Sequence, residues 1–179
     1  MATDIKILAK NEQIKRALSR VMSTLPAGGD GTPVMRSIGR VLLTGLQLRF
    51  RAQKAPDGTP WKPSQRVKRE GGQTLRDTGM LRDSFSASAT SSRAQVGTNS
   101  IKAAIHQFGG TIKHPGGTRY VIVDGMARFV SNSLVGPVSG VTKPHPIDMP
   151  ARPMLGDSDA DRLEILSVLE THFKGRWSQ

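Results

Sequence analysis

Four short motifs between Pro56 and Gly110 decide the fold: PDGTPWK at residues 56–62, LRDTGMLRDSF at 75–85, VGTN at 96–99 and IHQFGG at 105–110. Proline, Asp-Gly and Gly-Gly recur within this stretch, at Asp57-Gly58, Pro60, Pro63, Gly71-Gly72 and Gly109-Gly110. Such residues end helices and form turns, because proline fixes one backbone angle and glycine tolerates positive φ. The stretch therefore predicts short elements joined by tight turns.

On the N-terminal side of this stretch, the apolar spacing predicts two helices. Residues 4–25 carry apolar side chains every three or four positions, which makes one apolar stripe. Residues 26–31 are rich in glycine and break this helix. A second helix is predicted to start with Thr32 as its cap and Pro33 in its first turn. Its apolar face carries Ile38, Leu42, Leu46 and Phe50.

A different face of the second helix is basic. It carries Arg36, Arg40 and Arg51. A solvated helix face is the simpler interpretation of such a stripe. The functional interpretation is a contact with acidic groups of a neighbouring subunit, or with DNA.

Trp61 lies between Pro60 and Pro63, in a predicted long loop over residues 54–74 with a short helix near its end. A tryptophan on an irregular segment either fills the core of its own domain or anchors a partner, since tryptophan is favoured at interface hot spots. Both interpretations stay open for Trp61.

Strand patterns follow. Residues 86–98 predict two strands joined at Ser91 and Ser92, and residues 119–130 predict a hairpin around an Asp-Gly turn. Between them, a short helix is predicted to end at Gly109 and to bury one apolar face, which is made by Ile101, Ala104, Ile105 and Phe108.

The C-terminal third predicts a projecting loop and a helix. Residues 131–150 contain four prolines and no periodicity, so we expect a long loop that orders against a partner. A helix over about 158–173 follows, with Asp157 or Ser158 as its cap. Its predicted apolar side is formed by Leu163, Leu166, Leu169 and Phe173, and Trp177 is a candidate terminal anchor.

Together these elements predict an α+β fold. We expect a single domain over residues 1–179, with long loops at 54–74 and 131–150. Two N-terminal helices precede a central antiparallel sheet with hairpins, and the C-terminal helix packs on that sheet.

Composition limits the function classes. The chain has 179 residues, a net charge of +12 and no cysteine, so disulfides and thiolate metal sites are excluded. The four histidines show no metal-binding or catalytic spacing, and no nucleophile elbow or phosphate-binding loop is present. We expect no catalytic, cofactor-binding or metal-binding residues, no enzyme and no membrane partner. The N-terminus lacks a signal-peptide pattern.

With the run ARPMLG at residues 151–156, the motifs resemble the phage virion-morphogenesis family, the tail-completion proteins of Mu-like and P2-like bacteriophages. The order and spacing of the motifs carry this resemblance. One departure is Lys102-Ala103-Ala104, where the family often has an aromatic residue. The resemblance marks the following residues as family positions and candidate interface residues: Asp57, Gly58, Trp61, Leu75, Thr78, Gly79, Leu81, His106, Gln107, Phe108, Gly109, Arg152 and Pro153.

The resemblance implies a structural subunit of the head–tail neck, a tail-completion or tail-terminator protein. Its partners would be copies of itself in a ring, most commonly a hexamer, and other neck and tail proteins such as the tail tube, stopper or connector. Nonspecific contact with packaged double-stranded DNA would suit the charge of +12. The protein would be assembled in the host cytoplasm and reside in the virion.

Three alternatives remain at this stage. The subunit could form the head-closure (stopper) ring instead of the tail terminator. It could also be a basic nucleic-acid-binding module without sequence preference, outside any virion. A two-carboxylate hydrolase is the third.

Overall fold

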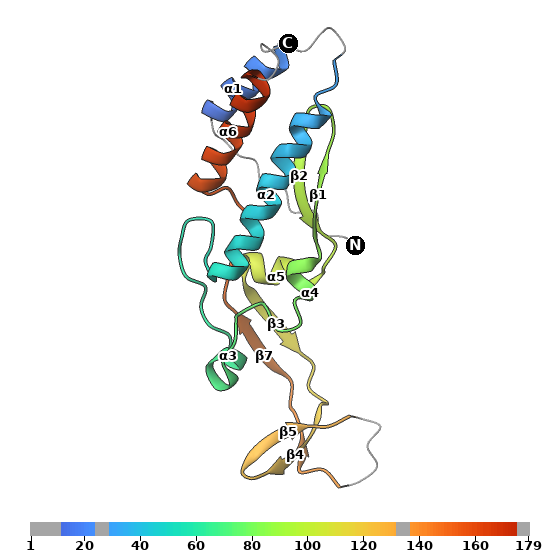
Figure 1. Cartoon of the computed structure of the whole chain (residues 1–179). Helices are drawn as coiled ribbons and strands as arrows, with labels where there is room; N and C mark the ends of the chain where they lie inside the picture. The colour runs from blue at the N-terminus through green and yellow to red at the C-terminus, as the bar shows by residue number, and fades with distance from the viewer. Residues whose placement is uncertain (1–11, 24–28, 132–136, 175–179) are drawn as a thin grey trace. The chain divides into compact units, whose positions relative to one another are not determined.

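The computed structural model describes residues 12–23, 29–131 and 137–174. The described residues divide into two compact units, which are coloured along the chain in Figure 1. The helical unit contains the residues up to Phe108 and from Ala151 onward. The strand unit is Gly109–Pro150. The single domain over residues 1–179 stays a prediction, because a division into two compact units does not decide whether these units fold independently.

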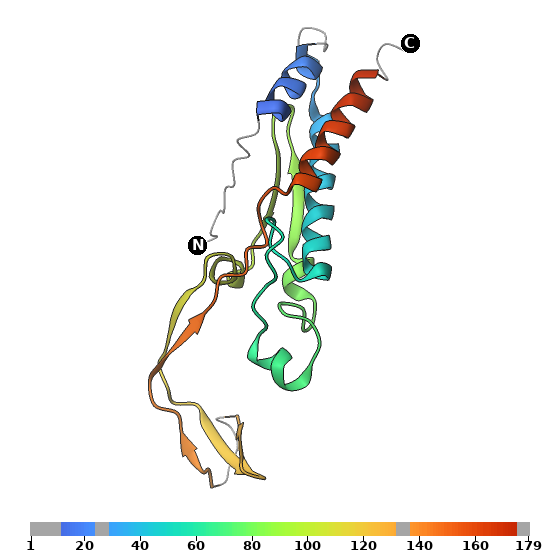
Figure 2. The ribbon, with the colours of Figure 1, turned by 90° about the vertical axis from the view of Figure 1, so that its left-hand side faces the viewer.

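The helical unit combines helices with one two-stranded ribbon. Its elements are α1 (Glu12–Ser23), α2 (Thr32–Ala52), α3 (Gln65–Glu70), α4 (Met80–Asp83), β1 (Phe85–Ala89), β2 (Ala94–Thr98), α5 (Lys102–Phe108) and α6 (Asp159–Lys174). The antiparallel β1–β2 ribbon lies along α2, as Figure 1 shows. Helix α6 lies along α2, as Figure 2 shows, and it also contacts α1. The α+β class is thus confirmed, and the main neighbours of α6 are helices.

Two apolar clusters form the core of the helical unit, and α2 contributes to both. Met35 and Ile38 belong to one cluster, whereas Leu46 and Phe50 belong to the other. The predicted apolar face of α2 is therefore confirmed. Burial of such side chains stabilises the fold by about 1.5–3 kcal/mol each.

The apolar side predicted for α6 is partly wrong. Ile165 and Leu169 are buried, whereas Leu163 is exposed. Apolar residues occur on more than one side of this helix, so spacing alone did not select the buried face. The side chain of Phe173, and Trp177 altogether, lie outside the residues that the structure describes.

The start of α2 also differs from the prediction. Gly31 is the cap residue, and the Asp30 carboxylate accepts a hydrogen bond from the Thr32 amide at 2.8 Å. Pro33 occupies the first turn, as predicted. Asp30 replaces Thr32 in this role because its carboxylate reaches the amide two residues on.

The strand unit consists of two antiparallel sheets in the part of it that is described. Strand β3 (Gly110–His114) pairs with β7 (His145–Met149), and β4 (Arg119–Val123) pairs with β5 (Met126–Phe129) and β6 (Gly140–Val141). The predicted hairpin is confirmed, with positive φ at both turn residues, 52° at Asp124 and 74° at Gly125.

The prediction of a loop over residues 131–150 is wrong for its second half, since β6 and β7 lie there. Both strands pair with residues far back in the sequence, and β7 contains Pro146. Its strand character is set by this distant pairing and not by a local pattern.

Candidate functional site

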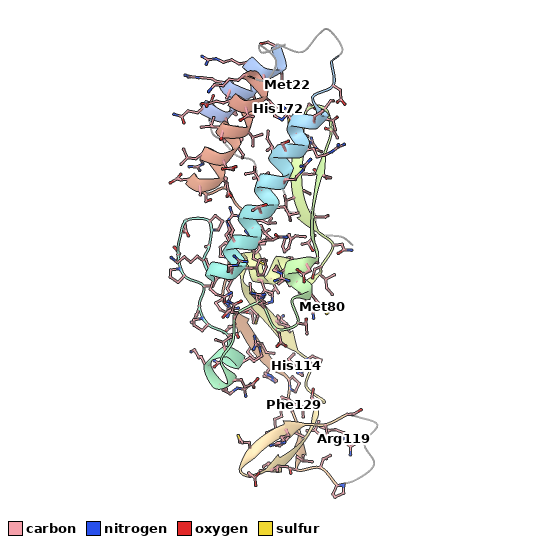
Figure 3. The ribbon with its side chains drawn as sticks, viewed as in Figure 1. Met22, Met80, His114, Arg119, Phe129 and His172 are labelled. Atoms are coloured by element: carbon pink, nitrogen blue, oxygen red, sulfur yellow. The ribbon has the colours of Figure 1, made fainter. Side chains whose placement is uncertain are left out.

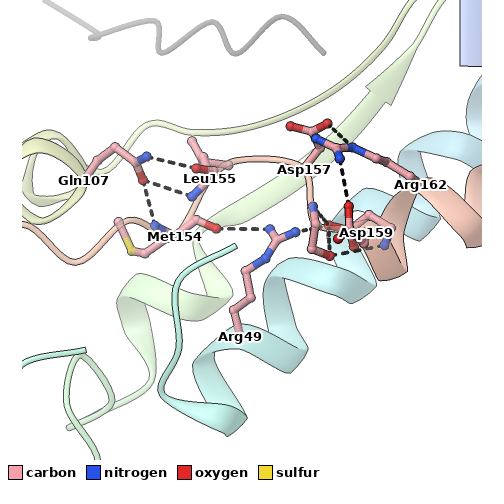
Figure 4. A network of polar contacts seen from close by, with 9 residues as sticks. Arg49, Gln107, Met154, Leu155, Asp157, Asp159 and Arg162 are labelled. Carbon is pink, nitrogen blue, oxygen red and sulfur yellow. Dashed lines mark hydrogen bonds and ion pairs between the residues drawn. The ribbon is translucent and has the colours of Figure 1, made fainter. Parts of the chain in front are cut away.

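Gln107 fastens the 154–155 segment to α5. Its side-chain oxygen accepts hydrogen bonds from the amides of Met154 and Leu155 at 2.8 and 2.9 Å, and its amide nitrogen donates to the Leu155 carbonyl at 3.0 Å (Figure 4). The buried face of α5 is therefore Ala103 and Gln107. The predicted apolar face is wrong, because a small residue and a bonded amide make the contact.

Two residues at the ends of that predicted face are exposed. Phe108 is 66% exposed, and Ile101 is more exposed still. Both therefore belong to the surface of the helical unit.

Trp61 lies in the core of the helical unit, which favours the core interpretation over the interface one. It is 5% exposed, and its ring meets that of Phe50 edge-on with centroids 5.4 Å apart. Its indole nitrogen donates to the Pro153 carbonyl at 3.0 Å. The loop that carries Trp61 is thereby fixed to the segment before α6.

Arg152 forms further hydrogen bonds between the segment before α6, the Trp61 loop and α5. Its guanidinium donates to the Lys62 carbonyl at 2.7 Å, and its backbone amide donates to the His106 carbonyl at 2.6 Å. Burial lowers the pKa of the Arg152 guanidinium. Arg152 therefore connects the Trp61 loop with the end of α5.

A buried ion pair between Arg49 and Asp161 joins α2 to α6, and no motif of the sequence indicates it. The Arg49 guanidinium donates to the Asp161 carboxylate and, at 3.2 Å, to the Met154 carbonyl (Figure 4). A methyl group added at Gly45 would collide with the same carboxylate. Glycine at this position therefore lets the Asp161 side chain approach α2.

Asp161 also completes the cap of α6. The Ser158 hydroxyl accepts from the Asp161 amide at 3.2 Å, and the Asp161 carboxylate accepts from the Ser158 amide at 2.9 Å. This reciprocal pair is a capping box. Of the two predicted caps, Ser158 is the right one, whereas Asp157 pairs with Arg162 at 2.8 Å.

The remaining family positions build turns and packing. Asp57 accepts from the Thr59 amide at 2.9 Å, and this hydrogen bond lowers the pKa of its carboxyl. Thr78 accepts from the Met80 amide at 3.4 Å, and Leu75 and Leu81 pack against the core. Positive φ values occur at Gly58, Gly79 and Gly109. These positions shape the chain, and any part in an interface stays a prediction.

His106 differs from its expected role. The resemblance marks His106 as a candidate interface residue, but its ring is partly buried, and its buried Nδ1 atom has no hydrogen-bond partner among the described residues. Burial lowers the pKa of His106, and the nearby charges of Arg152 and Lys102 lower it further. The ring is therefore held in its neutral form.

This shift predicts an acid-sensitive contribution to stability. Below about pH 6.5 the unfolded chain takes up a proton on His106 that the folded chain resists, so the free energy of unfolding should fall as the pH falls. His106→Gln removes this contribution. Urea unfolding from pH 7 to 5 should therefore show a smaller loss for the variant. Identical pH dependence in both proteins would contradict the prediction.

A hollow of about 380 Å³ on the helical unit is basic. We call it the arginine hollow, and it is lined by Thr44, Gln47, Leu48, Arg51, Arg76, Arg82 and Asp83. Arg82 and Asp83 form a two-point pair with distances of 2.6 and 2.9 Å. Of the predicted basic stripe, Arg36, Arg40 and Arg51 are all exposed, and Arg51 reaches this hollow.

The strand unit exposes apolar side chains on both faces of one sheet. Residues paired across β4 and β5 share a face, so Tyr120 and Phe129 lie on one side and Val123 and Met126 on the other. Phe129, marked in Figure 3, is 70% exposed, and Met126 is 61% exposed. No described residue of the strand unit is buried. A sheet of this kind lacks a core of its own.

Within the described ranges, no group of three or more histidine or acidic side chains is arranged to hold a metal ion. None of the described helices is both long and apolar enough to span a membrane.

Comparison with known proteins gives one family. The profile of the phage virion morphogenesis family matches residues 9–174. A curated relative, the Mu-like prophage FluMu G protein 2 of Haemophilus influenzae (strain ATCC 51907 / DSM 11121 / KW20 / Rd), is 28% identical over 163 residues, which are 91% of each chain. No solved structure matches the chain at a significant level.

Proposed function

Because the chain belongs to the phage virion morphogenesis family, its role lies in virion assembly, and we propose that it completes the tail. In this proposal, six copies form a closed ring at the head–tail neck, between the tail tube and the stopper or connector. The ring lets tails join DNA-filled heads. The subunit performs no catalysis.

The strand unit is the observation that supports this proposal. It exposes apolar side chains on both faces of β4 and β5, and no described residue in it is buried. Sheets with apolar residues on both faces are normally covered on both sides. Exposed apolar patches of this kind mark protein interaction sites. A unit with exposed apolar faces fits a subunit that binds other subunits, whereas catalysis does not require such a unit.

The different surfaces of head and tail give a physical reason why a separate ring is needed at the neck. A tail polymer ends in a repeating surface, and a head presents a different one. One interface cannot complement both, so a ring with two different faces is needed.

Deleting the gene tests the proposal. We expect DNA-filled heads and separate tails in electron micrographs of the lysate, with no infectious particles. Tails of abnormal length would place the ring at the tail end. Tails of normal length with heads that leak DNA would favour the stopper ring instead. Joined particles that fail only at lysis or genome delivery would contradict a role in the neck, as would one or two copies per particle.

The exposed arginines predict weak DNA binding. Arg36, Arg40 and Arg51 extend from α2, and the chain carries a charge of +12. Binding should show no sequence preference and should weaken steeply as salt rises, because phosphate contacts release counterions. Fluorescence anisotropy over a salt series measures this. Tight binding to one sequence at physiological salt would favour a nucleic-acid-binding module outside the virion.

A further inference from the structure

The arginine hollow has the charge and the apolar wall to receive an acidic side chain. Its lining contributes three positive charges, from Arg51, Arg76 and Arg82, against one negative charge from Asp83. The exposed side chain of Leu48 forms an apolar part of the wall. A carboxylate with apolar neighbours therefore suits this hollow.

The three arginines differ in how far they are already engaged. Arg82 is held by Asp83, and Arg76 donates one hydrogen bond to the Gln73 side chain at 2.9 Å. Among the described residues, the Arg51 guanidinium has no ion-pair or hydrogen-bond partner. Arg51 is thus the group that an incoming carboxylate would engage first.

The tip of the β4–β5 hairpin offers a matching group. Asp124 is exposed in the turn, and the register pair Val123 and Met126 flanks it with exposed apolar side chains. The strand unit has one other acid, Asp148, and the Thr111 hydroxyl donates to its carboxylate at 2.6 Å. Asp124 therefore supplies the available negative charge of this unit in a strongly basic chain.

We infer that the Asp124 tip of one copy docks into the arginine hollow of the next copy. The inference rests on the proposed ring and names its subunit contact. Asp124 would pair with Arg51, while Val123 and Met126 would cover Leu48. A contact between two different surfaces of the same chain is heterologous, and such contacts form a ring when the rotation from one copy to the next closes. DNA suits the hollow less well, because a phosphodiester has no apolar group to cover the exposed side chain of Leu48.

Cysteine cross-linking tests the contact directly, since the chain contains no cysteine. Met126→Cys and Gln47→Cys variants, which both keep Asp124 and Arg51, are produced together and recovered in assembled particles, where they should form a disulfide-linked dimer that contains one copy of each. Ser92→Cys, at the exposed β1–β2 turn outside the hollow, replaces Gln47→Cys in the control and should give no dimer. Absence of the Met126–Gln47 dimer in assembled particles would overturn the inference.

Charge reversal gives a second, independent test by complementation of the gene deletion. Arg51→Asp and Asp124→Arg should each lower the yield of infectious particles at least about tenfold, because like charges would face each other. The chain with both changes should recover most of the yield. Melting curves of the free variants check that each one folds. Failure of the double variant to recover, with folding intact, would count against the contact.

The outcomes separate this contact from the proposed function. Unjoined heads and tails in the deletion, without the cross-link in complemented particles, would leave tail completion standing and remove the contact. Loss of DNA binding in Arg51→Asp with a normal particle yield would instead assign the hollow to DNA and overturn the inference.

Discussion

Replacing Trp61 with alanine should lower the free energy of unfolding by about 3–5 kcal/mol. The ring is 5% exposed and contacts Phe50, so its removal leaves a cavity next to the largest fully buried side chain of the unit. It also leaves the Pro153 carbonyl without its hydrogen-bond donor. Urea unfolding of the purified protein measures the change.

Trp61→Phe is the matched control for this prediction. Phenylalanine keeps much of the apolar volume but cannot donate to the Pro153 carbonyl, so the loss should be clearly smaller than for alanine. If Trp61→Ala left the unfolding free energy unchanged while virion assembly failed, the ring would act at an interface and its place in the core would be wrong.

Replacing Arg49 with methionine should cost about 3–5 kcal/mol, because the buried Asp161 carboxylate would lose its counter-charge. Only 4% of the Asp161 side chain is exposed, so water cannot compensate well. The free energy of unfolding from urea titrations decides this as well. The Met154 carbonyl would also lose a donor.

Arg51→Met provides the control, because Arg51 stands two residues further along the same helix and is exposed. Its effect on the free subunit should stay within about 0.5 kcal/mol. Equal effects of the two substitutions would show that the Arg49–Asp161 pair contributes no more than a surface charge. Gly45→Ala should act in the same direction as Arg49→Met, since its methyl group would displace the Asp161 carboxylate.

Features that depend on neighbouring residues could be predicted from the sequence. The Asp124–Gly125 turn, the β1–β2 ribbon and the apolar face of α2 follow from local turn chemistry and from helical spacing. The difference between Arg49 and Arg51 could not be predicted. Both are arginines near the end of α2, and the carboxylate that pairs with Arg49 comes from Asp161, 112 residues away.

The candidate site also has features that the sequence indicates and features that it does not. The family motifs identified residues such as Gln107 and Arg152, whose side chains hold distant backbone segments together, and their spacing gave no sign of that role. The arginine hollow is assembled from α2, a loop and α4, so no single stretch of sequence predicts it. Exposure of Phe129 depends on which strands cover the sheet, and the alternation of residues does not reveal that.

Folding costs conformational entropy, and burial of a core normally offsets that cost. The strand unit has no buried described residue to offset it. Small sheets with no packed face have marginal stability by themselves, so in the proposed ring part of this entropy loss would accompany association with a neighbouring subunit. In the proposed ring, a pair of subunits would leave two docking surfaces unmatched and would separate readily. Only closure gives every strand unit a neighbour. Stability would then belong to the complete ring, and incomplete rings would dissolve before they could end tail growth.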